Sequence, residues 1–220
     1  MIFYLDTANL DKIKELVPYK FCSGITTNPS LAMKEGVSSY KILIKDIVCI
    51  LKEFKKPLSI EVFTNEPDKI YSEAMELMEA YDYCELYIKV PINYENIKII
   101  ENLKKNQIKI NCTCVFSLTQ VLMCIQSEVE IISLFYNRIK DQQDDPNRII
   151  KISKNIINKL NSKSKILLGS IRKLKDIEEG CENGADIATI PPHLFIESCI
   201  NEGSEKSIQQ FMNDVKKIKI

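Results

Sequence analysis

Residues 86–116 read LYIKVPINYENIKIIENLKKNQIKINCTCVF, and this stretch decides the fold class. The apolar runs at 86–90 and 108–116 have the length and composition of buried strands. Between them, residues 94–104 repeat apolar side chains at the spacing of a helix that covers a sheet with one face. A strand, a helix and a second strand in this order form the unit from which parallel sheets are built.

The same unit recurs along the whole chain. Further strands are predicted at 2–6, 24–28, 58–62, 129–135, 166–170 and 186–190. Helical spacing recurs at 9–17, 38–54, 67–81, 118–126, 146–160 and 174–183. Eight such strands alternating with helices predict a single (β/α)8 TIM-barrel domain over residues 1–220. A doubly wound open sheet is the alternative, but no glycine-rich nucleotide loop follows the first strand.

An extra helix is predicted at 204–219, beyond the eight units. Its apolar residues follow helical spacing, at Ile208, Phe211, Met212, Val215 and Ile218. Because the barrel is complete without this helix, we expect it to pack across the barrel or at a subunit interface.

Composition narrows the range of partners. Lysine plus arginine equals aspartate plus glutamate at 30 each, so we expect neither nucleic acid nor a membrane surface as a partner. No apolar stretch has transmembrane length, and the N-terminus has no signal-peptide pattern, which predicts a cytoplasmic protein. No CxxC pair occurs and His193 is the sole histidine, so no metal site is predicted. The eight cysteines are expected to be reduced, and those in apolar runs, such as Cys49, Cys84 and Cys112, to be buried.

Lys89 is unusual because it lies inside an apolar strand. A lysine there pairs with an opposite charge, extends to water, or gives up its proton more readily than usual. An unprotonated lysine amine is the nucleophile that attacks a ketone carbonyl to form a Schiff base. A lysine that only extends its ammonium to solvent is the alternative, and the residues around Lys89 must decide between the two.

Polar residues gather at the carboxyl ends of the predicted strands, where barrel active sites are assembled. They are Asp6, Thr26, Thr27, Asn28, Glu61, Asn111, Thr113 and Ser133. Carboxylates move protons between hydroxyl and carbonyl oxygens, and amides and hydroxyls hold the hydroxyls of a sugar. The alternative for single members is local: residues 6–9 cap the first helix, and residues 26–28 form a turn before Pro29.

An anion site is predicted near the seventh strand. Ser170 ends that strand, Arg172 lies at the start of the next helix, and Arg138 follows the sixth strand. Backbone N–H groups and guanidinium groups in this position bind phosphate in many barrels. In a chain without net charge, this arrangement indicates a small phosphorylated molecule as the ligand. Unrelated surface arginines are the alternative.

Several motifs in chain order resemble the transaldolase family, in particular its short-chain branch, which includes the fructose-6-phosphate aldolases. The resemblance spans nearly the whole chain, and the Thr-Thr-Asn-Pro-Ser motif is its most specific part. The matching segments are 3–9 (FYLDTAN), 24–31 (GITTNPSL), 88–91 (IKVP), 111–113 with 116–117, the single positions 133, 135 and 138, and then 170–172 (SIR) and 184–191 (GADIATIP).

The resemblance implies a role for each of these residues. Lys89 is the Schiff-base lysine, Asp6 accepts the proton of the C4 hydroxyl, and Glu61 transfers protons through a water held with Thr113. The implied substrate-binding residues are Thr27, Asn28, Asn111, Ser133, Phe135, Arg138, Ser170 and Arg172. The resemblance implies no cofactor, and it implies a ring-type homo-oligomer such as a pentamer or decamer.

Two positions separate the branches of the family. Glu61 and Phe135 resemble the transaldolases, whereas the fructose-6-phosphate aldolases have glutamine and tyrosine there. We therefore expect transfer of a dihydroxyacetone unit from fructose 6-phosphate or sedoheptulose 7-phosphate to an aldose phosphate, in the pentose phosphate pathway. A fructose-6-phosphate aldolase and a non-catalytic sugar-phosphate-binding barrel are the alternatives. Leu134, Tyr136 and Asn137 depart from the proline, small and glycine residues that the family has beside Phe135.

Overall fold

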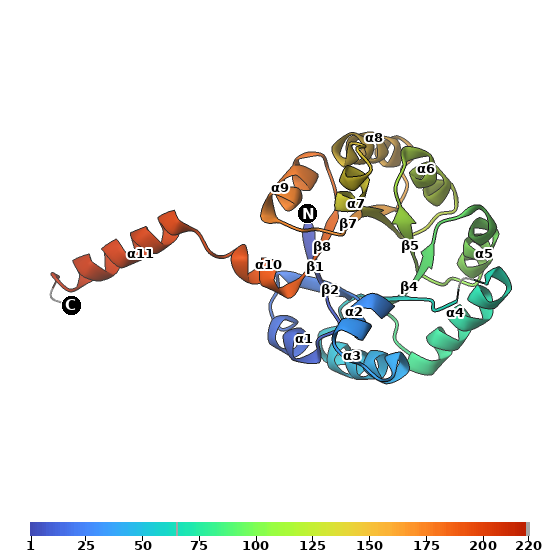
Figure 1. The fold of residues 1–220 in the computed structure, drawn as a ribbon, viewed down its shortest axis with the longest axis horizontal. Coiled ribbons are helices and arrows are strands. Elements are labelled where there is room, and N and C mark those ends of the chain that lie inside the picture. The colour runs from blue at the N-terminus through green and yellow to red at the C-terminus, as the bar shows by residue number, and fades with distance from the viewer. Residues whose placement is uncertain (65, 219–220) are drawn as a thin grey trace.

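Eight parallel strands close into a barrel in the computed structural model, which describes residues 1–64 and 66–218 (Figure 1). Each strand pairs with the next along the chain, and β8 pairs with β1, which confirms the predicted (β/α)8 fold. The strands are β1 (Ile2–Asp6), β2 (Cys22–Thr26), β3 (Leu58–Glu61), β4 (Leu86–Pro91), β5 (Ile110–Val115), β6 (Ile131–Phe135), β7 (Lys165–Gly169) and β8 (Ile187–Ile190).

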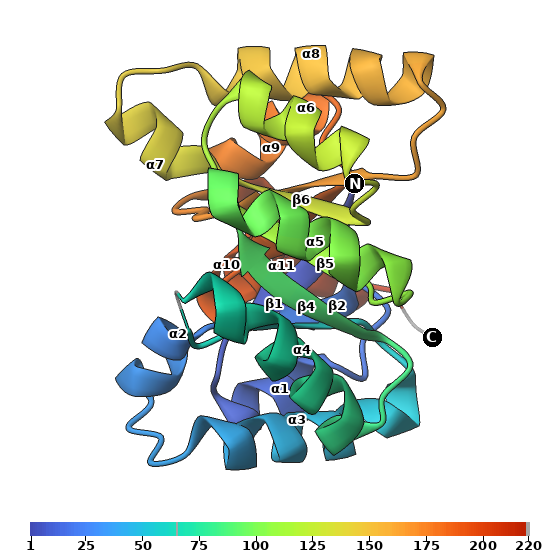
Figure 2. The ribbon, with the colours of Figure 1, turned by 90° about the vertical axis from the view of Figure 1, so that its right-hand side faces the viewer.

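Helices surround the barrel, as the end-on and side views show (Figures 1 and 2). Those before the C-terminal helix are α1 (Leu10–Leu16), α2 (Pro29–Lys34), α3 (Tyr40–Phe54), α4 (Pro67–Tyr81), α5 (Tyr94–Lys105), α6 (Leu118–Gln126), α7 (Tyr136–Asp141), α8 (Pro146–Lys159), α9 (Leu174–Glu182) and α10 (Pro192–Glu197). The short helices α2 and α7 lie in segments for which the sequence predicted no helix. Both follow a strand directly at the barrel rim, and each is too short to show a clear helical period.

Two layers of side chains fill the barrel interior. The lower layer is an apolar cluster of Tyr4, Tyr87, Ile131, Leu167 and Ile187. Because side chains alternate along a strand, residues two positions further on point into the same interior, one layer higher. That upper layer includes Asp6, Lys89, Ser133 and Thr189. The apolar layer therefore forms a floor beneath a polar layer.

Gly24 on β2 makes room for this floor. A Cβ atom at this position would lie 2.7 Å from the ring of Tyr4, closer than side-chain atoms approach one another. Any larger residue would displace the Tyr4 ring from the barrel interior. Strand residues that alternate with the interior ones pack outward against the helices, and Ile88 and Val90 on either side of Lys89 are fully buried in this main core.

The C-terminal helix α11 (Glu202–Val215) extends away from the barrel (Figure 1). It begins two residues before the predicted 204–219 and ends four residues before its limit, and residue 219 lies outside the described residues. No residue of α11 is buried, and Phe211 is 65% exposed. In the described part of the chain, no helix combines the length and the apolar character that crossing a bilayer requires.

All eight cysteines are free thiols. Cys112 and Cys124 are buried as expected, but Cys49 and Cys84 are exposed, so the expectation of burial was wrong for them. Cys49 lies on α3, where an apolar run of sequence continues past the buried face of the helix.

Candidate active site

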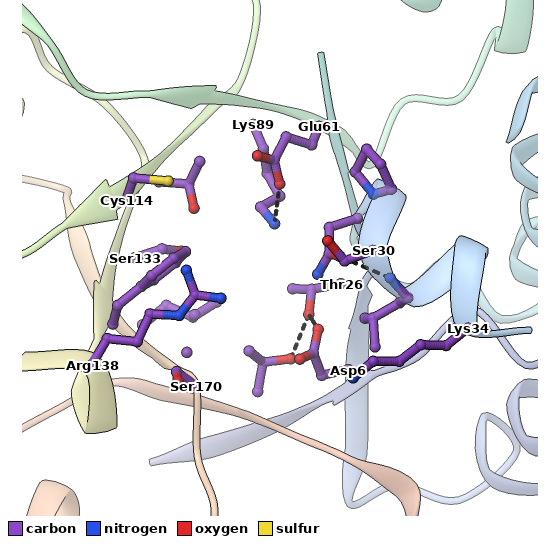
Figure 3. Close-up of a pocket in the computed structure, with 18 residues that line it drawn as sticks. Asp6, Thr26, Ser30, Lys34, Glu61, Lys89, Cys114, Ser133, Arg138 and Ser170 are labelled. Atoms are coloured by element: carbon purple, nitrogen blue, oxygen red, sulfur yellow. Dashed lines mark hydrogen bonds and ion pairs between the residues drawn. The ribbon is translucent and has the colours of Figure 1, made fainter. Parts of the chain in front are cut away.

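A cavity of about 390 Å³ opens above the polar layer, at the carboxyl ends of the strands (Figure 3). It brings together most of the residues predicted from the sequence. Those in its wall are Asp6, Thr26, Asn28, Glu61, Lys89, Thr113, Ser133, Phe135, Arg138 and Ser170. The predicted residues Thr27, Asn111 and Arg172 do not line it.

Lys89 and Glu61 face each other across two neighbouring strands. Their Cα atoms are direct partners in the β3–β4 pairing, and Lys89 Nζ lies 3.0 Å from Glu61 Oε2 (Figure 3). Lys89 is 6% exposed and also donates to the backbone oxygen of Thr27 at 3.4 Å. Pairing offsets much of the cost of burying an ammonium group. The carboxylate that compensates the charge is also placed to take the proton that Lys89 must lose before it attacks a carbonyl.

Asp6 on β1 occupies another part of the same wall. Its Oδ1 accepts a hydrogen bond from Thr26 Oγ1 at 2.7 Å, and the Thr26 hydroxyl lies 2.6 Å from that of Thr189. Burial raises the pKa of Asp6, while the bond from Thr26 and the charge of Lys89 partly oppose this effect. A carboxylate with a raised pKa takes a proton from a substrate hydroxyl more readily, as a general base must do.

Thr113 and Cys114 on β5 both line the cavity, although they are neighbours in sequence. Alternation would place them on opposite faces, but Cys114 has a left-handed backbone (φ 58°) and the β5–β6 register shifts between Cys112 and Val115. The bulge turns the Cys114 side chain toward the site. Within residues 1–64 and 66–218, the fully buried Thr113 hydroxyl has no hydrogen-bond partner, so it is available to a substrate group.

Asn111 does not line the cavity but supports a residue that does. Its Oδ1 accepts from Ser133 Oγ at 2.6 Å, and its Nδ2 donates to Ser59 Oγ at 3.1 Å. The amide of Asn111 therefore fixes the Ser133 hydroxyl, which does line the cavity. Thr27 is also fully buried behind the wall, where its backbone oxygen accepts from Lys89.

Asn28 combines the two explanations that the sequence left open. It caps α2 by accepting a hydrogen bond from the backbone N–H of Leu31 at 3.0 Å, and it also lines the cavity. Because Oδ1 serves the cap, the amide NH₂ is the group that remains for a substrate. Asn9 caps α1 in the same way, through the backbone N–H of Lys12, but lies outside the cavity wall.

Arg138 on α7 and Ser170 after β7 lie together at the end of the cavity where the sequence predicts an anion site (Figure 3). The Arg138 guanidinium lies 4.8 Å from the centre of the Phe135 ring, a cation–π contact that orients it. In the described ranges, no carboxylate forms an ion pair with Arg138, which leaves its charge for a ligand. Ser170 has a left-handed backbone (φ 59°), an unusual conformation for a residue with a side chain.

Arg172 points elsewhere. Its guanidinium contacts the carboxylate of Asp141 at the end of α7 with two hydrogen bonds of 2.8 and 2.5 Å. Both side chains are about half exposed, at 54% and 52%. The Arg172 hydrogen bonds hold the pKa of Asp141 below its ordinary value. The second arginine that the sequence assigned to the anion site is therefore engaged by a carboxylate in this structure.

Several residues of the wall were not predicted as site residues, among them Lys34 and Thr189. Thr189 follows the floor residue Ile187 by two positions on β8, so strand alternation alone is sufficient to find it. Lys34 ends α2 and lies near Asp6 at the rim (Figure 3). Its position depends on a six-residue helix that the sequence did not predict.

Comparisons with known proteins identify the family and the fold. A family model described as transaldolase/fructose-6-phosphate aldolase matches residues 3–220. A probable transaldolase 2 of Listeria monocytogenes is 34% identical over 214 residues, covering 97% of this chain and 95% of the relative. A probable transaldolase of Methanococcus vannielii is 35% identical over 210 residues, covering 94% and 95%. A solved thiamine phosphate pyrophosphorylase from Pyrococcus furiosus shares the fold alone, with a TM-score of 0.60 at 12% identity and coverage of 86% and 85%.

Proposed function

Because this chain belongs to the transaldolase/fructose-6-phosphate aldolase family, we propose that it is a transaldolase that works through a Schiff base on Lys89. The observation that carries the proposal is the buried Lys89–Glu61 pair, 3.0 Å apart, in one cavity with Asp6. A lysine that only extended to solvent would have no need of this burial or of a carboxylate beside it.

The proposed cycle begins when Lys89 gives a proton to Glu61 and attacks the C2 carbonyl of a ketose phosphate. Glu61 then protonates the departing hydroxyl of the carbinolamine through a water near Thr113, and one water leaves as the imine forms. Asp6 takes the proton of the C4 hydroxyl, the C3–C4 bond breaks, and an aldose phosphate departs. The three-carbon enamine that stays on Lys89 attacks the aldehyde of the acceptor, Asp6 returns its proton, and one water releases the product.

The other end of the cavity, at Arg138 and Ser170, supports a phosphorylated substrate. Arg138 and Ser170 line the same cavity as Lys89, which supports our proposal that they bind the phosphate of a sugar whose carbonyl carbon is at Lys89. We propose fructose 6-phosphate or sedoheptulose 7-phosphate as donors, aldose phosphates as acceptors, and the pentose phosphate pathway as the setting. Arg172 joins this site only when its pair with Asp141 opens. The chemistry needs no cofactor, since the lysine amine itself activates the carbonyl.

A transferase is favoured over the lyase alternative by Phe135. Its ring lines the cavity and carries no hydroxyl to protonate the enamine, so the enamine persists until an acceptor arrives. The test is to incubate the enzyme with fructose 6-phosphate, with and without erythrose 4-phosphate, and to separate the products. Sedoheptulose 7-phosphate and glyceraldehyde 3-phosphate that form only with the acceptor support the transferase. Free dihydroxyacetone without an acceptor supports the aldolase, and binding without turnover supports the non-catalytic barrel.

The proposal extends to assembly and location. Helix α11 leaves the barrel with Ile208, Phe211 and Met212 exposed, and another copy of the chain is the partner that we propose for this apolar face, in a ring such as a pentamer or decamer. Light scattering of wild type and of Phe211→Asp tests it: the variant is expected to have the smaller mass.

The eight free thiols and the phosphorylated substrates favour the cytoplasm as the location of this protein.

A further inference from the structure

A buried polar pair that the proposed cycle does not use lies beside the anion-binding end of the cavity. Asn137 on α7 and Asp176 on α9 are 6% and 0% exposed. Asn137 Nδ2 donates to Asp176 Oδ2 at 2.7 Å and to the backbone oxygen of Ser170 at 2.8 Å. One amide group therefore connects three elements: α7, the loop after β7 and α9.

Asp176 also holds the loop itself. Its Oδ2 accepts from the backbone N–H groups of Arg172 and Lys173, each at 3.1 Å. Ser170, which lines the cavity at the start of this loop, has a left-handed backbone. In a residue other than glycine, surrounding contacts are needed to maintain that conformation. The bonds from Asn137 and Asp176 bracket the segment from Ser170 to Lys173 and supply those contacts.

The charge of the buried carboxylate is compensated from the side of the cavity that carries Arg138. Lys140 Nζ lies 3.5 Å from Asp176 Oδ1 and 2.8 Å from Glu179 Oε2. Glu179 in turn accepts from the hydroxyl of Tyr136 at 2.8 Å. Tyr136, Asn137 and Lys140 all belong to α7, the short helix on which Arg138 is mounted. The network thus joins the helix that carries Arg138 to the loop that carries Ser170.

We infer that Asn137 and Asp176 are positioning residues that set the phosphate affinity of this site by fixing Arg138 and Ser170 relative to each other. The inference rests on the proposed function, in which these two residues bind the phosphate. Preorganised donors bind an anion more tightly because less freedom is lost on binding. If the pair is broken, the two halves of the anion site move independently, while Lys89, Glu61 and Asp6 on their strands are unaffected.

The test compares Asn137→Ala and Asp176→Asn with the wild type and with Ser164→Ala as a matched structural control. Ser164 also donates a buried hydrogen bond, 2.6 Å to the backbone oxygen of Val129, but it lies outside the cavity wall. Calorimetry measures the Kd for inorganic phosphate, and kinetics measure kcat and KM for erythrose 4-phosphate and for D-glyceraldehyde as acceptors.

The expected result is a rise of about tenfold in the Kd for phosphate and in the KM for erythrose 4-phosphate, with kcat and the KM for D-glyceraldehyde within about twofold of wild type. Ser164→Ala should lower the melting temperature and leave both constants unchanged. Asn137→Ser, which keeps a single donor hydrogen, is the second variant in case Asn137→Ala does not fold, and its effect should be intermediate.

Equal losses for both acceptors, or an unchanged phosphate Kd in a folded variant, would overturn the inference and leave only a structural role. This result differs from failure of the proposed function, in which the wild type itself transfers nothing although it binds phosphate. In that case the phosphate Kd values measured by calorimetry still test the inference about Asn137 and Asp176. If the wild type binds no phosphate, both this inference and the proposed anion site are wrong.

Discussion

The two ends of the cavity are built in different ways. Asp6, Glu61 and Lys89 are strand residues whose positions are fixed by the barrel register, with Glu61 and Lys89 as direct partners. Arg138 and Ser170 lie instead on a six-residue helix and on a loop with a left-handed residue. In the proposed function, the reactive end therefore takes its geometry from the barrel register, whereas the anion end depends on the side-chain contacts that hold it. Substitutions at the two ends should differ in size and in kind.

The largest effect is expected from Lys89→Met, which removes the nucleophile and keeps most of the length of the side chain. The transfer rate should fall by at least about 10⁴-fold, since Lys34, the other lysine of the wall, lies at the end of α2 and is not paired with Glu61 as Lys89 is. Steady-state transfer between fructose 6-phosphate and erythrose 4-phosphate measures it. Lys109→Met, at a lysine paired with Glu85 outside the cavity, is the control and should retain its activity.

Asp6→Asn should lower the transfer rate by about 10²- to 10⁴-fold while keeping the hydrogen bond from Thr26. A smaller loss than tenfold would show that another group takes the C4 proton. Single-turnover release of glyceraldehyde 3-phosphate separates this step from formation of the imine, which the variant should still complete.

Asp6→Asn should also change how the stability of the folded protein depends on pH. Because burial raises the pKa of Asp6 in the folded protein, the folded state binds more protons than the unfolded state above the ordinary value of 3.8. Stability contributed by this group therefore falls as the pH rises from 3.8 through the raised pKa. Asp6→Asn removes that loss, so its melting temperature should exceed that of wild type at neutral pH and not at pH 3. A lower melting temperature at neutral pH would contradict this account.

Phe135→Tyr tests the role of the Phe135 ring, which lies between the two ends of the cavity. Phe135 contacts both Phe116 and the Arg138 guanidinium, and the added hydroxyl would enter the cavity. Release of free dihydroxyacetone without an acceptor should rise by about tenfold or more, because the enamine gains a proton donor. The measurement is dihydroxyacetone release from fructose 6-phosphate, with Phe116→Tyr as the matched aromatic control. Equal release by both variants would argue against the role given to Phe135.

The smallest effect is expected from Asp141→Asn, which frees Arg172. Exposed ion pairs contribute little, so the phosphate Kd should tighten by less than about fivefold, and added salt should reduce the difference. Calorimetry at low and high ionic strength measures it. A Kd that does not change at low salt would indicate that Arg172 has no part in anion binding.

The barrel fold and most residues of the cavity could be predicted from the sequence. The two ends of the cavity differ in how far their geometry could be predicted. Strand alternation with period two places Lys89 two residues after the floor residue Tyr87, and Asp6 two after Tyr4, so the reactive end was predictable. The β5 bulge was not, because the backbone of Cys114 results from tertiary contacts and not from its residue type.

The anion end was harder to predict for a related reason. The sequence identified Arg138, Ser170 and Arg172 by residue type and position, but not the partner that each would take. The bond from Arg172 to Asp141, and those from Asn137 to Ser170 and Asp176, join residues about 31 to 39 positions apart. Contacts of this range depend on how α7 packs on α9, and no local period in the sequence records that packing.

Borohydride trapping with fructose 6-phosphate tests the central claim most directly. Reduction converts a Schiff base into a stable secondary amine, which peptide mapping by mass spectrometry assigns to one lysine. The account predicts a reduced three-carbon adduct on Lys89, present in wild type and in Lys109→Met and absent from Lys89→Met. No adduct on folded wild-type protein, or an adduct on a different lysine, would contradict it.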